Sequence, residues 1–419
     1  MQPTADRPTT ATLAHATMIR TSPLLLILAF SAAGCRHSGP PNDPDPPAET
    51  RRADRATALR DAGIDPNAVT RFLDDARAGA FGRFDHFILM RHGRLLVDER
   101  LDVGAPQGPR EATADHQYDY EDPGWHPYYR AGDLHTQQSV TKSVTSILVG
   151  MAIDDGSIPD GVSTPAMSWF GDYDPDATDP RRAAMTLEDL LTMRSGIDWN
   201  ESLPYSDPDN TCTQLELSDD WISFVVDRPM REAPGERFDY NSGASVLLGK
   251  IVREATGQPA DEFAQARLFA PLGITEFYWK RTPKGEVDTE GGLYLRPLDM
   301  ARIAQLMLQG GQWEGRQLVS KHWVERSTSP VVPRIDPEVA TSPGYGYQWW
   351  IDGHRPDEPY LFAGNGYGGQ FPIVLPELDV VMMLQAWNLE PPARSATEAV
   401  MTQIVPTIDA SVPVASQGR

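Results

Sequence analysis

A serine and a lysine stand three positions apart at Ser139 and Lys142, directly before the apolar run 144–153. If this run is helical, the two side chains lie one turn apart on the same face of its first turn. A serine hydroxyl is a poor nucleophile until a base takes its proton, and a desolvated lysine amine can serve as that base. The spacing therefore indicates nucleophilic catalysis. The alternative is an ordinary helix start in which Ser139 is the N-cap.

Lysine is rare in this chain, which makes the lysine at position 142 informative. Five of the 37 basic residues are lysines: Lys142, Lys250, Lys280, Lys284 and Lys321. Arginine stays protonated in proteins, whereas a buried lysine can lose its proton. A lysine where arginine is the usual cation therefore favours a group that must titrate.

A second polar group, Tyr240, Asn241 and Ser242, precedes the predicted helix 244–252. A phenol has an unperturbed pKa of about 10, and a neighbouring ammonium can lower that pKa enough for general-base work. Tyr240 and Ser242 are therefore candidates for moving protons. The alternatives are a core aromatic role for Tyr240 and a helix N-cap role for Ser242.

A third group is rich in glycine and precedes two predicted strands, 371–375 and 380–384. The group consists of Gly364, Asn365, Gly366, Tyr367 and Gly368. Glycines at a strand let a substrate approach the backbone, whose N–H groups can stabilise an oxyanion. The alternative is a tight bend in an antiparallel sheet.

Local patterns predict the elements that position these groups. Residues 53–80 are expected to form one helix. The runs 84–90 and 94–100 flank a compact turn with a glycine, which indicates a β-hairpin. A capped helix is expected at 185–193.

Two long polar stretches, 104–137 and 197–219, lack periodicity and are predicted to be surface loops. The second stretch contains Trp199, Glu201 and Tyr205. Loops of this length are often functional, so both stretches are candidates for shaping a binding site.

The composition excludes some classes of function. At 419 residues, with 40% hydrophobic and 23% charged residues, the chain can form one large domain or two moderate ones. The 59 acidic residues outnumber the 37 basic ones and give a net charge of -22. Nucleic-acid binding requires a basic surface, so no nucleic-acid partner is predicted.

An aspartate-rich stretch at 172–176 imitates the start of a calcium loop. The calcium-loop motif is incomplete, because Ala177 replaces the turn glycine and Ala183 replaces the closing glutamate. No metal site is therefore predicted.

The N-terminal segment 1–35 has the composition of a targeting signal. Arg20 precedes the apolar stretch 23–30, which is too short for a transmembrane helix, and small residues then lead to Cys35. This pattern resembles a bacterial lipoprotein signal, in which Cys35 is lipidated. The protein is then expected in the bacterial cell envelope, lipid-anchored in the membrane and facing the periplasm or the exterior. Secretion is the alternative.

The remaining chain divides by composition. The Pro-rich stretch 36–50 is expected to be an extended tether, 51–408 the folded domain and 409–419 a tail. If Cys35 is lipidated, Cys212 has no partner and no disulfide forms.

In this order and spacing, the three groups resemble the serine β-lactamase and penicillin-binding-protein superfamily, of which Ser-x-x-Lys is a signature. Within it the chain looks most like the class C β-lactamase-like hydrolases, closest to the esterase and 6-aminohexanoate-dimer hydrolase branch. Ser242 stands where class C β-lactamases have asparagine, and residues 366–370 follow that branch's third motif. The resemblance implies an α+β fold of the β-lactamase/transpeptidase type. Its antiparallel sheet is covered by helices, and a mostly helical subdomain is inserted between the first and last strands.

The resemblance also implies roles for single residues. Ser139 is implied as the acylated nucleophile, Lys142 as its base and Tyr240 as the group that passes protons to the leaving group. Ser242 would join the hydrogen-bond network, and the backbone N–H groups of Ser139 and Tyr367 would form the oxyanion hole. The glycine-rich group would bind substrate. No metal or organic cofactor is implied.

One departure from the family pattern bears on the substrate. Where the family usually carries Lys-Thr-Gly or His-x-Gly, this chain has Gly364-Asn365-Gly366. The cation expected to hold a β-lactam or peptide carboxylate is therefore missing. A small neutral ester or amide is predicted, cleaved through a covalent acyl-enzyme. The alternatives are a class C-type β-lactamase or DD-peptidase, and an envelope-anchored binding protein without catalysis.

Overall fold

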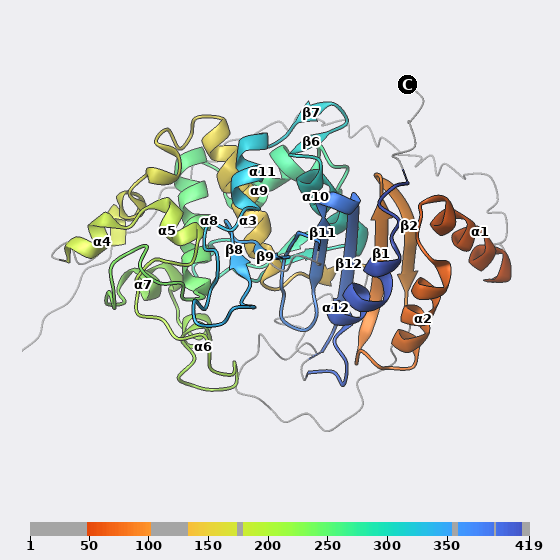
Figure 1. Ribbon diagram of the computed structural model, residues 1–419. Helices are drawn as coiled ribbons and strands as arrows, with labels where there is room; N and C mark the ends of the chain where they lie inside the picture. Colours follow the sequence, from red (N-terminus) through yellow and green to blue (C-terminus); the bar gives the residue numbers. More distant parts are fainter. Residues whose placement is uncertain (1–47, 102–132, 174–178, 354–358, 389–390, 413–419) are drawn as a thin grey trace, which may run out of the picture. The chain divides into compact units, whose positions relative to one another are not determined.

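A computed structural model describes residues 48–101, 133–173, 179–353, 359–388 and 391–412 (Figure 1). The predicted signal segment 1–35, including Cys35, lies outside these residues, and so does most of the predicted loop 104–137. Residues 174–176 of the aspartate-rich stretch also lie outside them. The first helix begins at Ala48, inside the segment predicted to be a tether.

Two strands lie near the start of the described chain, and most of the helices follow before the last strands. The helices are α1 (Ala48–Asp61), α2 (Pro66–Arg77), α3 (Val140–Asp154), α4 (Pro180–Ala184), α5 (Leu187–Leu191), α6 (Thr211–Glu216), α7 (Trp221–Val226), α8 (Ser242–Thr256), α9 (Ala260–Ala264), α10 (Pro297–Leu308), α11 (Lys321–Ser327) and α12 (Ala396–Ala399). The strands are β1 (Phe84–Arg91), β2 (Arg94–Arg100), β3 (His135–Thr136), β4 (Tyr278–Trp279), β5 (Leu293–Leu295), β6 (Gln312–Trp313), β7 (Arg316–Gln317), β8 (Gly344–Tyr345), β9 (Trp350–Asp352), β10 (Leu361–Ala363), β11 (Phe371–Leu375) and β12 (Val380–Ala386).

The main sheet joins strands from both ends of the described chain. Within the described residues it has seven strands in the order β2-β1-β12-β11-β10-β9-β8, and neighbouring strands are antiparallel. Leu89 in β1 lies opposite Val97 of β2 on one side and Met382 of β12 on the other. The predicted antiparallel sheet with a mostly helical insertion is therefore confirmed (Figure 1).

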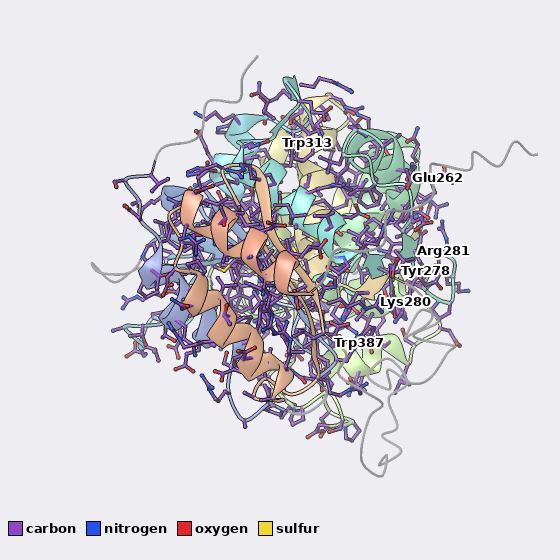
Figure 2. All side chains as sticks on the ribbon, turned by 90° about the vertical axis from the view of Figure 1, so that its right-hand side faces the viewer. Glu262, Tyr278, Lys280, Arg281, Trp313 and Trp387 are labelled. Atoms are coloured by element: carbon purple, nitrogen blue, oxygen red, sulfur yellow. The ribbon has the colours of Figure 1, made fainter. Side chains whose placement is uncertain are left out.

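The two faces of this sheet pack against different helices. Successive side chains of a strand point to opposite faces. In β1, Phe87 and Leu89 join a core with α2 and the C-terminal helical segment, residues 396–407. Ile88 and Met90 join a second core with α3, α8 and α10. We name these the α2 face and the α3 face. Figure 2 views the molecule from the α2 face, with α1 and α2 in front of the sheet.

The α2 face is mostly apolar and rich in phenylalanine. Four rings gather there in stacked, tilted and edge-on contacts, those of Phe72, Phe81, Phe84 and Phe87. All four side chains are fully or almost fully buried. Such aromatic pairs add roughly 0.5–1.5 kcal/mol each to the effect of burial alone.

The prediction of a single helix at 53–80 is wrong, because the segment forms α1 and α2. Gly63 between them adopts a left-handed conformation with φ of 66°, which a glycine tolerates. Asp65 then caps α2 by accepting a hydrogen bond from the Asn67 N–H at 2.9 Å, and Pro66 occupies the first helical turn. These stop and start signals are present in the sequence, but the helical composition on both sides outweighed them.

Helices α3 and α8 pack against each other on the α3 face. Almost every residue of α3 is buried, which explains why its sequence is an apolar run and not an amphipathic stripe. Helix α8 begins after Asn241, whose side chain accepts a hydrogen bond from the Ala244 N–H at 3.0 Å. Asn241 therefore caps this helix, and the Ser242 hydroxyl is used elsewhere.

Shorter helices complete the inserted region. The helix predicted at 185–193 is present as the shorter α5, which starts with a capping box formed by Thr186 and Asp189. The stretch 197–219, predicted to be irregular, contains α6, capped by Asn210. Across the described ranges, no helix is both long enough and apolar enough to cross a membrane.

Candidate active site

Ser139 lies between β3 and α3. Gln138, directly before it, has a positive φ of 47°, which is uncommon for a residue other than glycine. The Ser139 side chain makes no capping hydrogen bond to α3, so the hydroxyl is not used as an N-cap. Instead, Lys142 Nζ donates a hydrogen bond to Ser139 Oγ at 3.0 Å. The structure thus brings the two residues together, as their spacing predicts.

Lys142 is buried beside a carboxylate that the motif does not include. Its side chain is 1% exposed, and Nζ also donates to the Glu290 carbonyl at 2.8 Å and to Glu290 Oε2 at 2.9 Å. Burial alone would lower the pKa of Lys142, but the Glu290 carboxylate raises that pKa well above its usual value. The raised pKa favours the ammonium form of Lys142, and its role as a base stays a prediction.

Tyr240 completes the contacts of the Ser139 hydroxyl. Its phenol hydrogen-bonds to Ser139, and Lys142 Nζ lies 5.5 Å from the centroid of its ring. The ring also stacks on Trp350, with centroids 5.8 Å apart. Burial raises the pKa of Tyr240, and the Lys142 ammonium opposes this rise. Tyr240 is therefore a neutral phenol at rest.

Ser242 reaches the site through a partly buried glutamate. Its hydroxyl donates to Glu201 Oε1 at 2.7 Å and its backbone N–H donates to Oε2 at 2.9 Å. The Trp199 indole N–H and the Tyr205 hydroxyl donate to the same carboxylate at 2.9 and 3.0 Å. Burial raises the pKa of Glu201, and Lys142 opposes the rise. The predicted network around Ser242 therefore centres on Glu201.

The glycine-rich group packs closely against the chain that leads into α3. A side chain at Gly366 would place its Cβ 2.5 Å from the Gln137 carbonyl oxygen, and one at Gly364 would meet Val140 at 3.1 Å. Gly368 has a φ of 82°, as the tight bend requires. The glycines therefore allow this segment to lie beside Ser139, the position that the predicted substrate-binding role requires.

Tyr367 and Asn365 occupy different positions in this segment. The Tyr367 ring meets Tyr205 edge-on, with centroids 5.3 Å apart, and its carbonyl accepts a hydrogen bond from the Gln370 side chain at 3.1 Å. Asn365 is exposed. The oxyanion role of the Tyr367 N–H stays a prediction, and so does substrate contact by Asn365.

One group of described residues has the composition of a metal site. The ligand atoms of Cys212, Glu216 and Glu290 lie within 4.8 Å of one another, and all three residues are buried. Glu290 already accepts a hydrogen bond from the Lys142 ammonium, which would repel a metal cation. We therefore assign no metal to this group. Cys212 is a free thiol.

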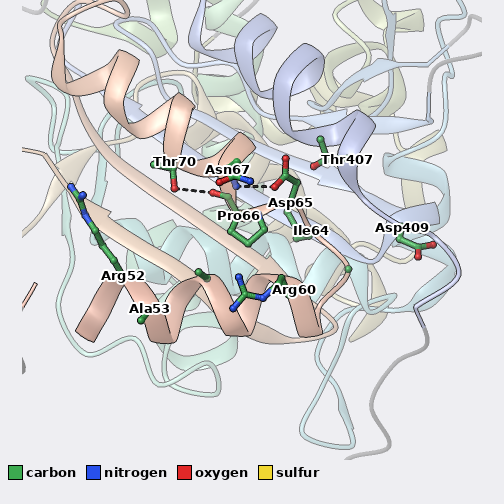
Figure 3. Close-up of a pocket in the computed structure, with 12 residues that line it drawn as sticks. Arg52, Ala53, Arg60, Ile64, Asp65, Pro66, Asn67, Thr70, Thr407 and Asp409 are labelled. Carbon is green, nitrogen blue, oxygen red and sulfur yellow. Dashed lines mark hydrogen bonds between the residues drawn. The ribbon is translucent and has the colours of Figure 1, made fainter. Parts of the chain in front are cut away.

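A separate hollow of about 670 Å³ lies between α1, α2 and the residues after the last helices (Figure 3). It is lined by Arg60, Asp65 and Asp409 among others, and by none of the residues around Ser139. Its polar groups are engaged locally, since Asp65 caps α2 and Thr70 donates to the Pro66 carbonyl. The hollow is therefore not the chemical site.

The sequence gives no clear signal that three further residues belong to the site: Glu290, Glu201 and Trp350. Glu290 is separated from Lys142 by 148 residues, and the glycines that follow it indicate a turn but no partner. Glu201 lies in a predicted functional loop, but nothing local links it to Ser242. These contacts depend on the tertiary fold.

Comparisons with known proteins find similar hydrolases. A family model described as Beta-lactamase matches residues 75–403. The 6-aminohexanoate-dimer hydrolase of Paenarthrobacter ureafaciens is 29% identical over 62% of this chain and 69% of its own length. Lovastatin esterase of Penicillium rubens is 27% identical over 41% of this chain and 46% of its own length.

Solved structures share the fold at low sequence identity. A D-stereospecific amidohydrolase from Streptomyces sp. superposes with a TM-score of 0.58 at 15% identity, covering 80% of this chain and 98% of that one. The octameric penicillin-binding protein homologue from Pyrococcus abyssi gives 0.55 at 20% identity, with coverage of 78% and 75%. Because the family model spans most of the described domain, including Ser139, Lys142 and Tyr240, the chain belongs to the Beta-lactamase family.

Proposed function

We propose that this protein is a serine hydrolase that cleaves a small neutral ester or amide through an acyl-enzyme on Ser139. The observation that carries the proposal is the contact of two proton-carrying groups with one hydroxyl. Lys142 and Tyr240 are both hydrogen-bonded to the Ser139 hydroxyl, and this hydroxyl does not cap α3. A serine placed only for structure would need neither partner.

The reaction follows from the charge states at the site. Lys142 is an ammonium and donates to Ser139 Oγ, so it stabilises a developing alkoxide but cannot take the serine proton. When Tyr240 has lost its proton, its oxygen takes the proton of Ser139 while Oγ bonds to the substrate carbonyl carbon. The same proton passes to the leaving alcohol or amine as the carbon–oxygen or carbon–nitrogen bond breaks.

Deacylation reverses these transfers. Water gives one proton to Tyr240 and bonds to the acyl carbon, and the ester bond to Ser139 then breaks. Ser139 recovers its proton from Tyr240, and the acid product leaves. Each step keeps the Lys142 ammonium beside Oγ, where it stabilises negative charge in a buried environment.

The surroundings of Ser139 favour a neutral, partly apolar substrate. Aromatic rings of Tyr205, Tyr240, Trp350 and Tyr367 lie around the site, and the segment Gly364-Asn365-Gly366 carries no cation. The relatives named above are a 6-aminohexanoate-dimer hydrolase and a lovastatin esterase, which fits this choice.

A parallel kinetic assay tests the proposal. Purified protein and its Ser139→Ala variant are compared on a short-chain p-nitrophenyl ester, a linear amide dimer and a chromogenic cephalosporin. We expect turnover of the ester or the amide that disappears in Ser139→Ala. Strong cephalosporin turnover would assign the protein to the β-lactamases instead. No turnover, together with no reaction of Ser139 with a fluorophosphonate, would favour a binding protein.

We also propose that the chain is anchored in the bacterial envelope through a lipid on Cys35. The support is the sequence alone, in which small residues lead directly to that cysteine after a short apolar stretch. Metabolic labelling with a fatty acid should be lost in Cys35→Ala and kept in Cys212→Ala, the control at the other cysteine. Labelling that persists in Cys35→Ala would overturn the anchor.

A further inference from the structure

Glu290 contacts the proposed catalytic lysine with two different atoms. Its carbonyl and its carboxylate each accept a hydrogen bond from Lys142 Nζ, and Ser139 Oγ accepts the third. An ammonium has three N–H groups, so these three acceptors use its full donor capacity. Glu290 therefore fixes both the position and the direction of Nζ at Ser139.

The segment that carries Glu290 is held rigidly. Asp288 Oδ1 accepts the backbone N–H groups of Glu290 and Gly291 at 3.2 and 3.0 Å. Thr289 is clamped between the two central helices: its carbonyl accepts from Thr145 of α3, and its hydroxyl donates to the Ser245 carbonyl of α8. Glu290 thus reaches Lys142 from a fixed turn between β4 and β5.

Close packing supports the same conclusion. A Cβ at Gly249 in α8 would lie 2.2 Å from Thr289 Oγ1, so only glycine lets the turn sit this near to the helix. The Trp279 indole N–H donates to the Asp288 carbonyl at 2.6 Å and holds the start of the turn. The turn is therefore positioned by α3, α8 and β4 together.

The charges near Lys142 make Glu290 the dominant partner. The other titratable groups that face this pair are Tyr240, Glu201, Cys212, Glu216, Asp288 and, behind Asp288, Lys280, which is labelled in Figure 2. Burial raises the pKa of Asp288 to about 7, so its charge is partial near neutrality. Among these groups, Glu290 is the carboxylate with a hydrogen bond to Nζ.

We propose that Glu290 is the positioning residue of this site, which holds Lys142 against Ser139 and keeps it an ammonium ion throughout the reaction. The consequence is that Tyr240, and not Lys142, must lose a proton before Ser139 can be acylated. The inference rests on the proposed function and concerns how the same site is activated. It adds to the Ser-x-x-Lys motif a carboxylate that the motif does not contain.

The test follows the rate at which a fluorophosphonate labels Ser139 as a function of pH, in the full-length protein and in Glu290→Gln. Glutamine keeps a hydrogen-bond acceptor but removes the charge. The Tyr240 phenol then loses its proton more easily, because a nearby negative charge has been removed. The pH at which labelling begins should therefore fall by about one to three units. A purely structural role for Glu290 would change the extent of labelling and not its pH dependence.

Two further variants complete the test. Glu286→Gln is the control, because it removes a carboxylate from the same segment between β4 and β5. Glu286 pairs with Lys250 and Arg253, so its loss should leave the pH dependence of labelling unchanged. If Glu290→Gln does not fold, Glu290→Asp decides, because its shorter carboxylate lies farther from Nζ and should still lower the onset of labelling, by about half a unit.

The outcomes separate the two proposals. Labelling of the parent protein with an unshifted onset in the folded Glu290 variant overturns the role of Glu290 and leaves the hydrolase proposal standing. Absence of labelling of Ser139 in the parent protein at every pH overturns both. A lowered onset in Glu290→Gln and an unchanged one in Glu286→Gln support the assignment.

Discussion

The two faces of the main sheet are buried to a similar degree but are built from different chemistry. The α2 face is filled mainly by apolar side chains such as those of Phe72 and Phe87, and its buried Arg91 donates hydrogen bonds to the backbone carbonyls of Ala62 and Asp409. The α3 face buries Lys142, Glu290 and a set of serine, threonine and glutamine side chains in addition to its apolar core. Buried ion pairs stabilise a fold little compared with apolar packing of the same volume. A buried carboxylate paired with a buried ammonium occurs on the α3 face, where the proposed function gives it a role.

The largest effect is expected from Lys142→Met, which turns part of the α3 face apolar. Activity should fall by about 10³-fold, because the charge that stabilises the developing negative charge beside Ser139 is lost. The free energy of unfolding should also fall by about 3–5 kcal/mol, since Glu290 is left as a buried charge without its ammonium. Ester turnover and urea denaturation measure the two effects.

The double variant Lys142→Met/Glu290→Gln sharpens this comparison. It removes both charges, so most of the lost stability should return while the activity does not. Recovery of stability without activity would show that the ion pair serves the reaction. A double variant as unstable as Lys142→Met would instead make the pair part of the structural framework.

Phe72→Ala tests the α2 face. Phe72 is completely buried, and its removal should lower the free energy of unfolding by about 3–5 kcal/mol while kcat/KM of the folded protein stays unchanged. Leu217→Ala is the control, because Leu217 is 60% exposed and should change stability by less than about 0.5 kcal/mol. A large drop in kcat/KM of folded Phe72→Ala would break the division between the faces.

Gly366→Ala should reduce activity more than stability. The new Cβ would lie 2.5 Å from the Gln137 carbonyl, so the segment must move away from Ser139. A displacement of about 1 Å near a reacting group costs about 100-fold in rate. Gly171→Ala has nothing within 4 Å of its Cβ and should leave kcat/KM unchanged. Equal rates for the two variants would contradict the proposed placement.

The pH dependence should be the smallest of these effects. Lys142 and Tyr240 both have raised pKa values, so both hold their protons near neutrality and the reactive form appears as the pH rises. We expect kcat/KM to increase up to tenfold per pH unit, or about 1.4 kcal/mol, until Tyr240 titrates. A rate that falls between about pH 7 and pH 9 would contradict this sign.

Local sequence patterns predict only part of this arrangement. Ser139 and Lys142 lie one helical turn apart, so their contact follows from helix geometry once α3 is recognised. The hairpin β1–β2 is also local. By contrast, Glu290 and Glu201 meet their partners through folding of distant segments, and no periodicity reports such a contact.

The helix break at Gly63 shows a different kind of limit. The signals were present in Gly63, Asp65 and Pro66, yet helix-forming residues on both sides favoured one continuous helix. Sheet order was predictable only through the resemblance of the whole chain to a family. The pairing of β1 with β12 has no local cause in either strand.

The pairing of β1 with β12 also decides when the protein can become active. The two strands are neighbours in the sheet but lie near opposite ends of the domain's sequence. The Trp387 indole N–H, after β12, donates to Asp85 of β1, 302 positions earlier. During synthesis the hairpin must therefore wait for almost the whole chain before its central partner emerges. A chain truncated before β12 would expose the edge of β1 and leave the segment 364–370 without its neighbour. We therefore expect hydrolytic activity only from chains in which the last strand has joined the sheet.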